Sequence, residues 1–319
     1  MLKLLRSPFI ILLSLAALSV GLAIAFKDTG FSPPGPLIQD EHFLDYEVRI
    51  YKRDDETIVE RICDRLPWQL SDFVERVIGR REWSGAEILK NGRRVFSTYG
   101  TAVWIADFGS NRLAGMDITG DGVPNIALSD QFGRLGGGSL WVFECGKKFR
   151  QIATVDSLGT YPELKDLDGD GIPEVIASDN AFYHFPLCYD GEPMPGVILR
   201  WHDGSYVAAR DLMAKPAPSQ QEFDAKAVQI RKTLESDDSW GAWDDLSTTA
   251  LELMYSGHET LGWKFLNDAL PESAEKEGFV SQFRGRLEES AYWPNLETQN
   301  STNKLDQNQH EDVAVKKID

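Results

Sequence analysis

The sequence predicts an α+β protein in which a β-propeller-like array of antiparallel hairpins with acidic loops precedes a small all-α domain. Turn glycines at positions 92, 146 and 204 lie 54 and then 58 residues apart. Two acidic segments, 117–130 and 166–179, align without gaps at an offset of 49 residues. A period near fifty with several strands per unit is typical of propeller blades or a similar β array. Two clear units are too few for an ordinary closed propeller.

The β-rich domain is expected over residues 39–214. Tyr46, Val48 and Ile50 alternate with charged residues, which indicates a half-buried strand. Asn91-Gly92 lies between apolar runs and is the strongest short signal for a hairpin. Further hairpins are expected at 139–149 and 196–206, and a helical insert at 71–78.

An α-helical domain is expected over residues 215–297. Prolines 216 and 218 mark its start, and Ser219 with Glu222 forms a capping box that opens a helix. Helices are expected from 219 to 234, 244 to 255, 259 to 269 and 272 to about 290. The polar tail 298–319 has too few apolar side chains to fold by itself and is expected to be disordered.

The first 26 residues have the composition of a targeting segment. Lys3 and Arg6 precede an apolar run, and Ala23-Ile24-Ala25 resembles a signal-peptidase site. A cleaved signal peptide, a membrane tether through residues 9–26 and a buried core helix are the alternatives, and the first two export the remainder. Residues 27–38 then form a Pro/Gly linker. We therefore expect an extracytoplasmic protein in the periplasm or cell envelope, secreted or N-terminally anchored.

Charge and cysteine content narrow the classes of protein further. The formal net charge of −17 argues against a nucleic-acid partner, because phosphates require basic surfaces. Three cysteines without a C-x-x-C pair argue against a zinc cluster. In an oxidising compartment a Cys145–Cys188 disulfide with Cys63 left over is one expectation, and three buried thiols are the other.

Residues 166–174 read D-x-D-x-D-G-x-x-E, a pattern that suits calcium. Calcium takes six to eight oxygen ligands, so alternate carboxylates on a tight loop can converge on it. The expected ligands are Asp166, Asp168, Asp170, the Ile172 carbonyl and Glu174. An EF-hand is excluded because Ala177 stands where that motif needs a bidentate Glu and the loop leads into a strand.

The first acidic loop is chemically weaker. Asp117 and Asp121 are its carboxylates, whereas Thr119 and Asn125 offer neutral oxygens. Two calcium sites are therefore expected, the second with the higher affinity, and magnesium is a competitor. The alternative is that both loops are Asx-turns capped by their own side chains, without metal.

The segments DITGDGVPNIALS and DLDGDGIPEVIAS resemble FG-GAP/VCBS repeats, the calcium-loop units of integrin-α-type β-propellers and many exported bacterial proteins. The resemblance covers about residues 85–210. It implies side-chain ligands at Asp117, Thr119, Asp121 and Asn125 with the Val123 carbonyl, and the five positions already named in the second loop. The chain departs from the family in having too few repeats for its usual seven-blade ring and in its helical C-terminal domain.

We found no catalytic constellation in the sequence. The main hypothesis is an exported, non-enzymatic calcium-binding scaffold that docks a protein or glycan partner. The alternatives are an exported metal-dependent hydrolase using residues 166–174 as its metal centre, and a purely structural envelope protein. The hydrolase would need an open coordination position and a nearby base.

Overall fold

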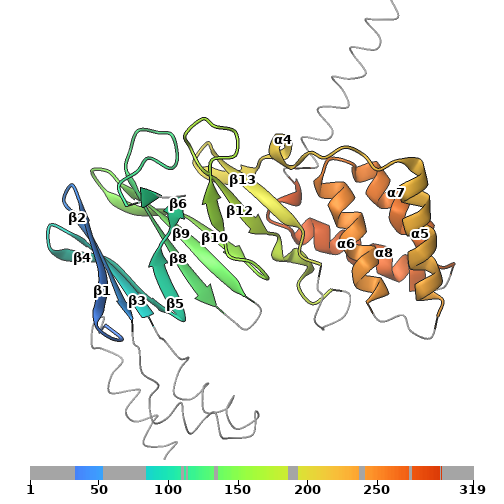
Figure 1. Ribbon diagram of the computed structural model, residues 1–319, viewed down its shortest axis with the longest axis horizontal. Coiled ribbons are helices and arrows are strands. Elements are labelled where there is room, and N and C mark those ends of the chain that lie inside the picture. Colours follow the sequence, from blue (N-terminus) through green and yellow to red (C-terminus); the bar gives the residue numbers. More distant parts are fainter. Residues whose placement is uncertain are drawn as a thin grey trace, which may run out of the picture. The chain divides into compact units, whose positions relative to one another are not determined.

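The computed structural model describes residues 33–52, 84–108, 111–112, 114–132, 136–185, 193–236, 241–272, 275–294 and 296 (Figure 1). In chain order the strands come first and the main helices follow. The predicted targeting segment, the helical insert at 71–78 and the polar tail lie outside the described residues. The α+β class expected from the sequence is confirmed: three four-stranded antiparallel sheets and several helices.

The first sheet is a meander of four strands in chain order. They are β1 (Leu37–Phe43), β2 (Tyr46–Lys52), β3 (Ser84–Lys90) and β4 (Arg93–Gly100). The alternation predicted for β2 holds, since Tyr46, Val48 and Ile50 are buried and the residues between them are less so. Asn91 and Gly92 have φ of 51° and 73°, the left-handed conformation of the predicted hairpin turn. β1 starts inside the segment expected to be linker.

The second sheet has the order β10-β9-β8-β5. Its strands are β5 (Ala102–Ile105), β8 (Asn125–Phe132), β9 (Gly137–Cys145) and β10 (Phe149–Ser157). Along the chain, β6 (Asp107–Phe108) and β7 (Asn111–Arg112) come between β5 and β8 and form a separate two-stranded sheet. The β9–β10 pairing confirms the predicted hairpin at 139–149. The first acidic loop leads directly into β8.

The third sheet is again a meander in chain order. Its strands are β11 (Glu163–Lys165), β12 (Glu174–Ser178), β13 (Gly196–His202) and β14 (Ser205–Ala208), and a 3-10 helix, η2 (Asn180–Phe182), follows β12. Asp203 and Gly204 form the turn of the predicted β13–β14 hairpin with φ of 47° and 86°. The second acidic loop lies between β11 and β12.

The helices follow the sequence prediction closely. They are α4 (Arg210–Met213), α5 (Gln220–Leu234), α6 (Ala242–Tyr255), α7 (Glu259–Ala269) and α8 (Glu275–Glu289). Ser219 and Glu222 form the expected capping box at the start of α5. The short helix α4 was not predicted. Among the described residues, no helix has the length and apolar character needed to cross a bilayer.

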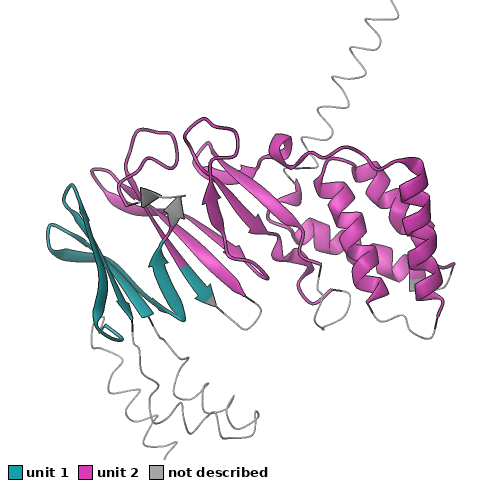
Figure 2. Cartoon of the chain, in the orientation of Figure 1, with its two compact units in different colours: residues 1–105, 130–132 teal, residues 106–129, 133–319 magenta. Residues whose placement is uncertain are grey.

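Two compact units divide the chain: residues 1–105 with 130–132, and residues 106–129 with 133–319 (Figure 2). Val48, Ile50 and Ile88 are fully buried in the first unit. In the second unit, one apolar cluster includes residues from the strands and from the helices. Phe182 of η2 lies 4.9 Å from Phe283 of α8, ring centre to ring centre. The helices therefore share a core with the strands of this unit, as expected from the sequence.

Candidate metal centre

The second acidic loop is a tight turn held by its own carboxylates. Asp166 Oδ1 accepts a hydrogen bond from the Gly169 amide (2.6 Å) and Oδ2 accepts one from the Gly171 amide (3.0 Å). Both glycines have positive φ, 81° and 88°, which side chains on Cβ disfavour. Asp170 Oδ1 accepts from the Ile172 amide at 2.7 Å. These bonds fix the path of the chain around the loop.

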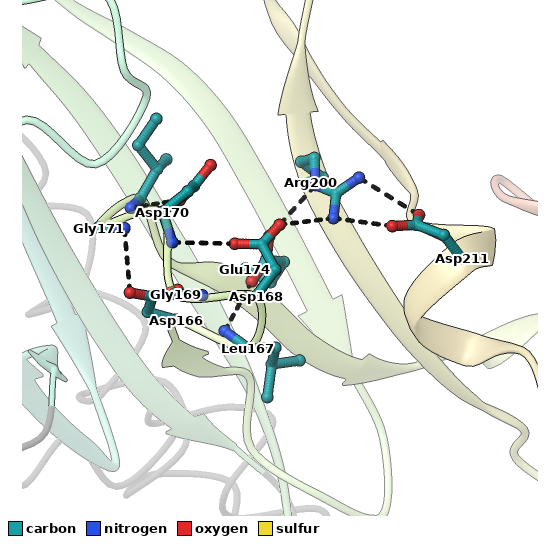
Figure 3. A network of polar contacts seen from close by, with 10 residues as sticks. Asp166, Leu167, Asp168, Gly169, Asp170, Gly171, Glu174, Arg200 and Asp211 are labelled. Atoms are coloured by element: carbon teal, nitrogen blue, oxygen red, sulfur yellow. Dashed lines mark hydrogen bonds and ion pairs between the residues drawn. The ribbon is translucent and has the colours of Figure 1, made fainter.

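Three of the predicted ligands converge in this loop (Figure 3). Asp166, Asp168 and Glu174 each offer a carboxylate oxygen, and the three atoms lie within 4.8 Å of one another. Glu174 is almost fully buried, 1% exposed, and its Oε2 accepts a hydrogen bond from the Leu167 amide at 2.9 Å. The Asp170 carboxylate is outside this group of three, and its role as a ligand stays a prediction.

A positive side chain lies on the same carboxylates. Arg200, from β13, places Nε 3.2 Å from Glu174 Oε1 and Nη2 2.9 Å from Asp168 Oδ2. Its other contacts are with Asp211 of α4, at 3.2 and 3.1 Å. Burial opposes the charge on Arg200, but the hydrogen bonds to Asp211 and Glu174 outweigh burial and raise its pKa. The guanidinium therefore balances part of the negative charge of the loop.

The first acidic loop has the same hydrogen bonds at corresponding positions. Asp117 accepts from the amides of Gly120 and Gly122, both at 2.7 Å. Asp121 accepts from the Val123 amide at 2.8 Å. Asn125 takes the place of Glu174: it is fully buried, and its Oδ1 accepts from the Ile118 amide at 2.9 Å. Two loops 49 residues apart thus have one hydrogen-bonding pattern.

The first loop differs in the charge that it presents. Thr119, in the position of Asp168, is 7% exposed, and its hydroxyl lies 3.3 Å from Asp117 Oδ1. Asn125 uses its Nδ2 to donate to the Phe143 carbonyl at 3.4 Å. The two carboxylates of the first loop, on Asp117 and Asp121, both accept hydrogen bonds from amides of the loop. The neutral oxygens therefore make this loop the weaker attraction for a cation.

The two loops lie directly against each other. A Cβ atom on Gly120 of the first loop would collide with Cδ1 of Ile172 in the second. Gly120 therefore makes room for Ile172, in addition to adopting a φ of 75°. A larger side chain at Gly120 would therefore displace Ile172 of the second loop.

The donor set fits a hard divalent cation in part. Carboxylate oxygens on a glycine-rich turn are the ligands that calcium prefers, and the second loop brings three together. Two of the three are also bound by Arg200. A cation in this loop would therefore compete with the guanidinium for Asp168 and Glu174.

Of the three cysteines, the structure describes one. Cys145 is buried, with its sulfur 3.9 Å from the Phe143 carbonyl oxygen. Cys63 and Cys188 lie outside the described residues, so the disulfide stays a prediction. The contacts of Arg200 with the loop and with Asp211 were missed because no motif spacing links these residues to the loop. A charged residue on the predicted strand beside the loop was the only available signal.

A buried polar cluster was also missed. Asp179, directly after β12, is 2% exposed and accepts a hydrogen bond of 2.6 Å from the Tyr255 hydroxyl of α6. Ser290, after α8, donates to the same Asp179 oxygen. Glu174 and Asp179 lie at opposite ends of β12, so this strand connects the acidic loop with the helices.

No protein-family model, no curated protein and no solved structure matches this chain at a significant level.

Proposed function

We propose that this chain is an exported, non-enzymatic calcium-binding module of the FG-GAP/VCBS type that serves as a binding or scaffold domain. The observation that carries the proposal is the convergence of Asp166, Asp168 and Glu174 oxygens within 4.8 Å on a turn held by backbone amides. Oxygen-only ligands on such a turn favour calcium over softer metals. Magnesium is the competing ion, with more of its coordination shell filled by water.

The ion would have a structural role in this proposal. Clustered carboxylates repel one another, and a bound cation removes that repulsion. The second loop joins the first two strands of its sheet, and the first loop leads into the second strand of another. Calcium in these loops would hold the strand ends in place. The three four-stranded antiparallel sheets would then be blade-like units of a short array rather than of a complete ring.

The partner in this proposal is a protein or a glycan, and the compartment is the periplasm or cell envelope. The net charge of −17 disfavours nucleic acid, and the apolar segment 9–26 would provide export or a membrane tether. The first and second loops face a compartment where calcium is abundant only if the chain is exported. The calcium proposal and the export proposal are therefore compatible, and each needs its own test.

Calorimetric titration of the full-length chain in non-ionic detergent with Ca²⁺ and Mg²⁺ tests the proposal. We expect two calcium sites of unequal affinity and a melting temperature that falls when a chelator is added. Asp168→Asn should weaken the tighter site, because it removes one of three converging carboxylates. Asp203→Asn is the matched control, since Asp203 is an exposed turn residue outside both loops and Asn tolerates its φ of 47°. Absence of calcium binding with an unchanged melt would overturn the proposal.

The alternative, a metal-dependent hydrolase centred on residues 166–174, is favoured by no observation on the described residues. Arg200 pairs with Asp168 and Glu174, two carboxylates that could otherwise act as a base for a reacting water. A cavity of about 300 Å³ is lined by residues of the helices and of the segment before α5, among them Lys215, Phe223 and Phe265, and by no acidic-loop residue. Hydrolysis of ester substrates that disappears in Asp168→Asn would restore this alternative.

A further inference from the structure

A second group of metal-binding side chains lies in the first unit, on the β1–β2 hairpin. Asp40 and His42 of β1 and Glu47 of β2 each offer one ligand atom, and the three atoms lie within 4.8 Å of one another. His42 Nε2 is 3.2 Å from Asp40 Oδ1. The two strands are adjacent and antiparallel, and β1 is the outermost strand of its sheet.

The backbone places these side chains together. Asp40 and His42 are two residues apart on one strand, so they project from the same face of the sheet. His42 and Glu47 are directly opposite each other in the antiparallel register. Cβ atoms of such pairs lie about 4.5–5.5 Å apart, close enough for both side chains to bind one ion.

The hairpin itself is anchored. Asp45, in its turn, is held by Asn91 of the β3–β4 turn: the Asn91 amide donates to the Asp45 carbonyl at 2.8 Å, and Asn91 Nδ2 donates to Asp45 Oδ2 at 3.0 Å. Phe43 and Tyr46 stack with ring centres 5.4 Å apart at the same end. The ligand positions therefore lie on a rigid element, which reduces the entropy lost when an ion binds.

Arg49 fixes the third ligand. It forms an ion pair with Glu47 Oε1 and lies 3.4 Å from Glu87 Oε1, which also accepts a hydrogen bond of 2.5 Å from the Tyr51 hydroxyl. Glu47 is thereby held beside Arg49 on the strand face. Arg49 also lowers the local negative charge, which disfavours a site that depends on charge alone.

We propose that Asp40, His42 and Glu47 form a surface site for a borderline divalent transition-metal ion of the Zn²⁺ or Cu²⁺ class. An imidazole nitrogen is a preferred ligand of these ions and a poor ligand of calcium, so this site differs in chemistry from the acidic loops. Three protein ligands leave at least one coordination position for water or another molecule. The site shares no residue with the acidic loops and does not depend on the calcium proposal.

The chain provides a matched control for an ordinary His–Asp contact. His202 Nε2 lies 3.4 Å from Asp203 Oδ2, and both side chains are exposed. Among the described residues this pair is not part of any group of three ligands. An effect of His42→Ala that His202→Ala lacks therefore reports the three-ligand site.

The experiment titrates the full-length chain in non-ionic detergent with Zn²⁺ by calorimetry and with Co²⁺ by visible absorption, with Ca²⁺ at saturating concentration throughout. We expect one Zn²⁺ site, with Co²⁺ absorption bands shaped by a nitrogen ligand. His42→Ala and Glu47→Gln should each weaken Zn²⁺ binding by at least about tenfold, since even a lost outer-shell partner weakens metal sites by that factor. His202→Ala should bind as the parent chain does.

Two results would overturn the proposal: no Zn²⁺ or Co²⁺ binding by the parent chain, or unchanged binding in both His42→Ala and Glu47→Gln. Circular dichroism of each variant checks that its fold is kept; His42 is an exposed residue, so its removal should leave the spectrum unchanged. The calcium titration is read separately, so its failure would leave this result standing.

Discussion

Arg200 Nε of β13 lies 3.2 Å from Oε1 of the buried Glu174, so a positive side chain from the neighbouring strand pairs with the second acidic loop. The pairing of β12 with β13 explains the contact: Val175 is opposite Leu199, which brings Glu174 level with Arg200. The same guanidinium contacts Asp211 at the start of α4. One side chain of β13 therefore links the carboxylates of the second loop to the start of α4.

We expect Arg200→Gln to raise the calcium affinity of the second loop. Removing the positive charge that binds two of the proposed ligands frees their oxygens and removes the repulsion between the guanidinium and the ion. At the dielectric constant of water, a divalent and a single charge about 5 Å apart repel by an energy that corresponds to about tenfold in affinity. The calcium-free protein should melt at a lower temperature, because Glu174 stays buried without its partner. Calorimetric titration and thermal melts with and without chelator measure both effects.

Arg286→Gln is the control for this variant. Arg286 forms an exposed ion pair with Glu289 on α8, at 3.1 Å, and such pairs contribute little. It should change neither the calcium affinity nor the melt. A calcium affinity of the second loop that is equal or lower in Arg200→Gln would contradict competition between the ion and the guanidinium.

Thr119→Asp should raise the calcium affinity of the first loop. Thr119 corresponds to Asp168 of the second loop, and a third carboxylate adds charge to a loop that has two. We expect the weaker calcium affinity to rise at least about tenfold, since ligand charge count, together with the rigidity of the site, sets calcium affinity. Thr119→Asn is the neutral control and should leave the affinity within a factor of a few. Equal affinities in the two variants would show that charge does not limit the first loop.

The contact between Ile172 and Gly120 predicts a difference between two glycines. Gly120 and Gly122 have nearly equal φ, 75° and 80°, but a Cβ atom would meet Ile172 only at Gly120. Gly120→Ala should therefore lower the free energy of unfolding by up to about 1 kcal/mol more than Gly122→Ala does, since Cδ1 is the free end of the Ile172 side chain and can move aside at a cost below that of overpacking a core. Urea denaturation measures both.

The Ile172→Ala background separates collision from backbone strain. With the Ile172 side chain shortened, the two alanine variants should become nearly equal in stability. A difference that persists in this background would mean that Ile172 is not its cause.

Local signals explain what could be predicted from the sequence. The turns at Asn91-Gly92 and Asp203-Gly204 and the glycines of both acidic loops adopt positive φ, which few residues tolerate. The capping box at Ser219 fixes the start of α5 in the same local way. Such features depend on a few neighbouring residues, so the pattern of the sequence contains them.

What could not be predicted depends on pairing between distant segments. Arg200 reaches the second loop only through the register of β12 with β13. Tyr255 and Ser290 meet Asp179 only after α6 and α8 pack on the strands. His42 and Glu47 are closer in the chain, but their contact depends on the turn at residues 44–45, where Leu44 adopts a φ of 51° that its side chain disfavours.

Two tyrosines with buried hydroxyl groups should respond differently to loss of the hydroxyl. The Tyr255 hydroxyl donates to buried Asp179 at 2.6 Å, whereas the buried Tyr206 hydroxyl has no hydrogen-bond partner among the described residues. Tyr255→Phe should therefore lower the free energy of unfolding by about 1–3 kcal/mol, and Tyr206→Phe should be nearly neutral. Urea denaturation at pH 7 compares them. Equal losses would show that the hydrogen bond to Asp179 does not determine the effect, since both variants keep the ring and remove only the hydroxyl.

Tyr255 and a second tyrosine near Asp179, Tyr292, predict how stability changes in alkaline solution. Burial, with the nearby charge of Asp179, raises the pKa of Tyr255 well above its usual value near 10, and burial raises the pKa of Tyr292 to about 12. The unfolded chain loses these protons near pH 10 while the folded chain keeps them, so stability is complete below pH 10 and falls as the pH rises toward the folded pKa. Each such tyrosine adds a slope of up to about 1.4 kcal/mol per pH unit. In urea denaturation from pH 9 to 11, Tyr255→Phe should therefore lose stability less steeply than the parent chain, and parallel curves would contradict the raised pKa of Tyr255.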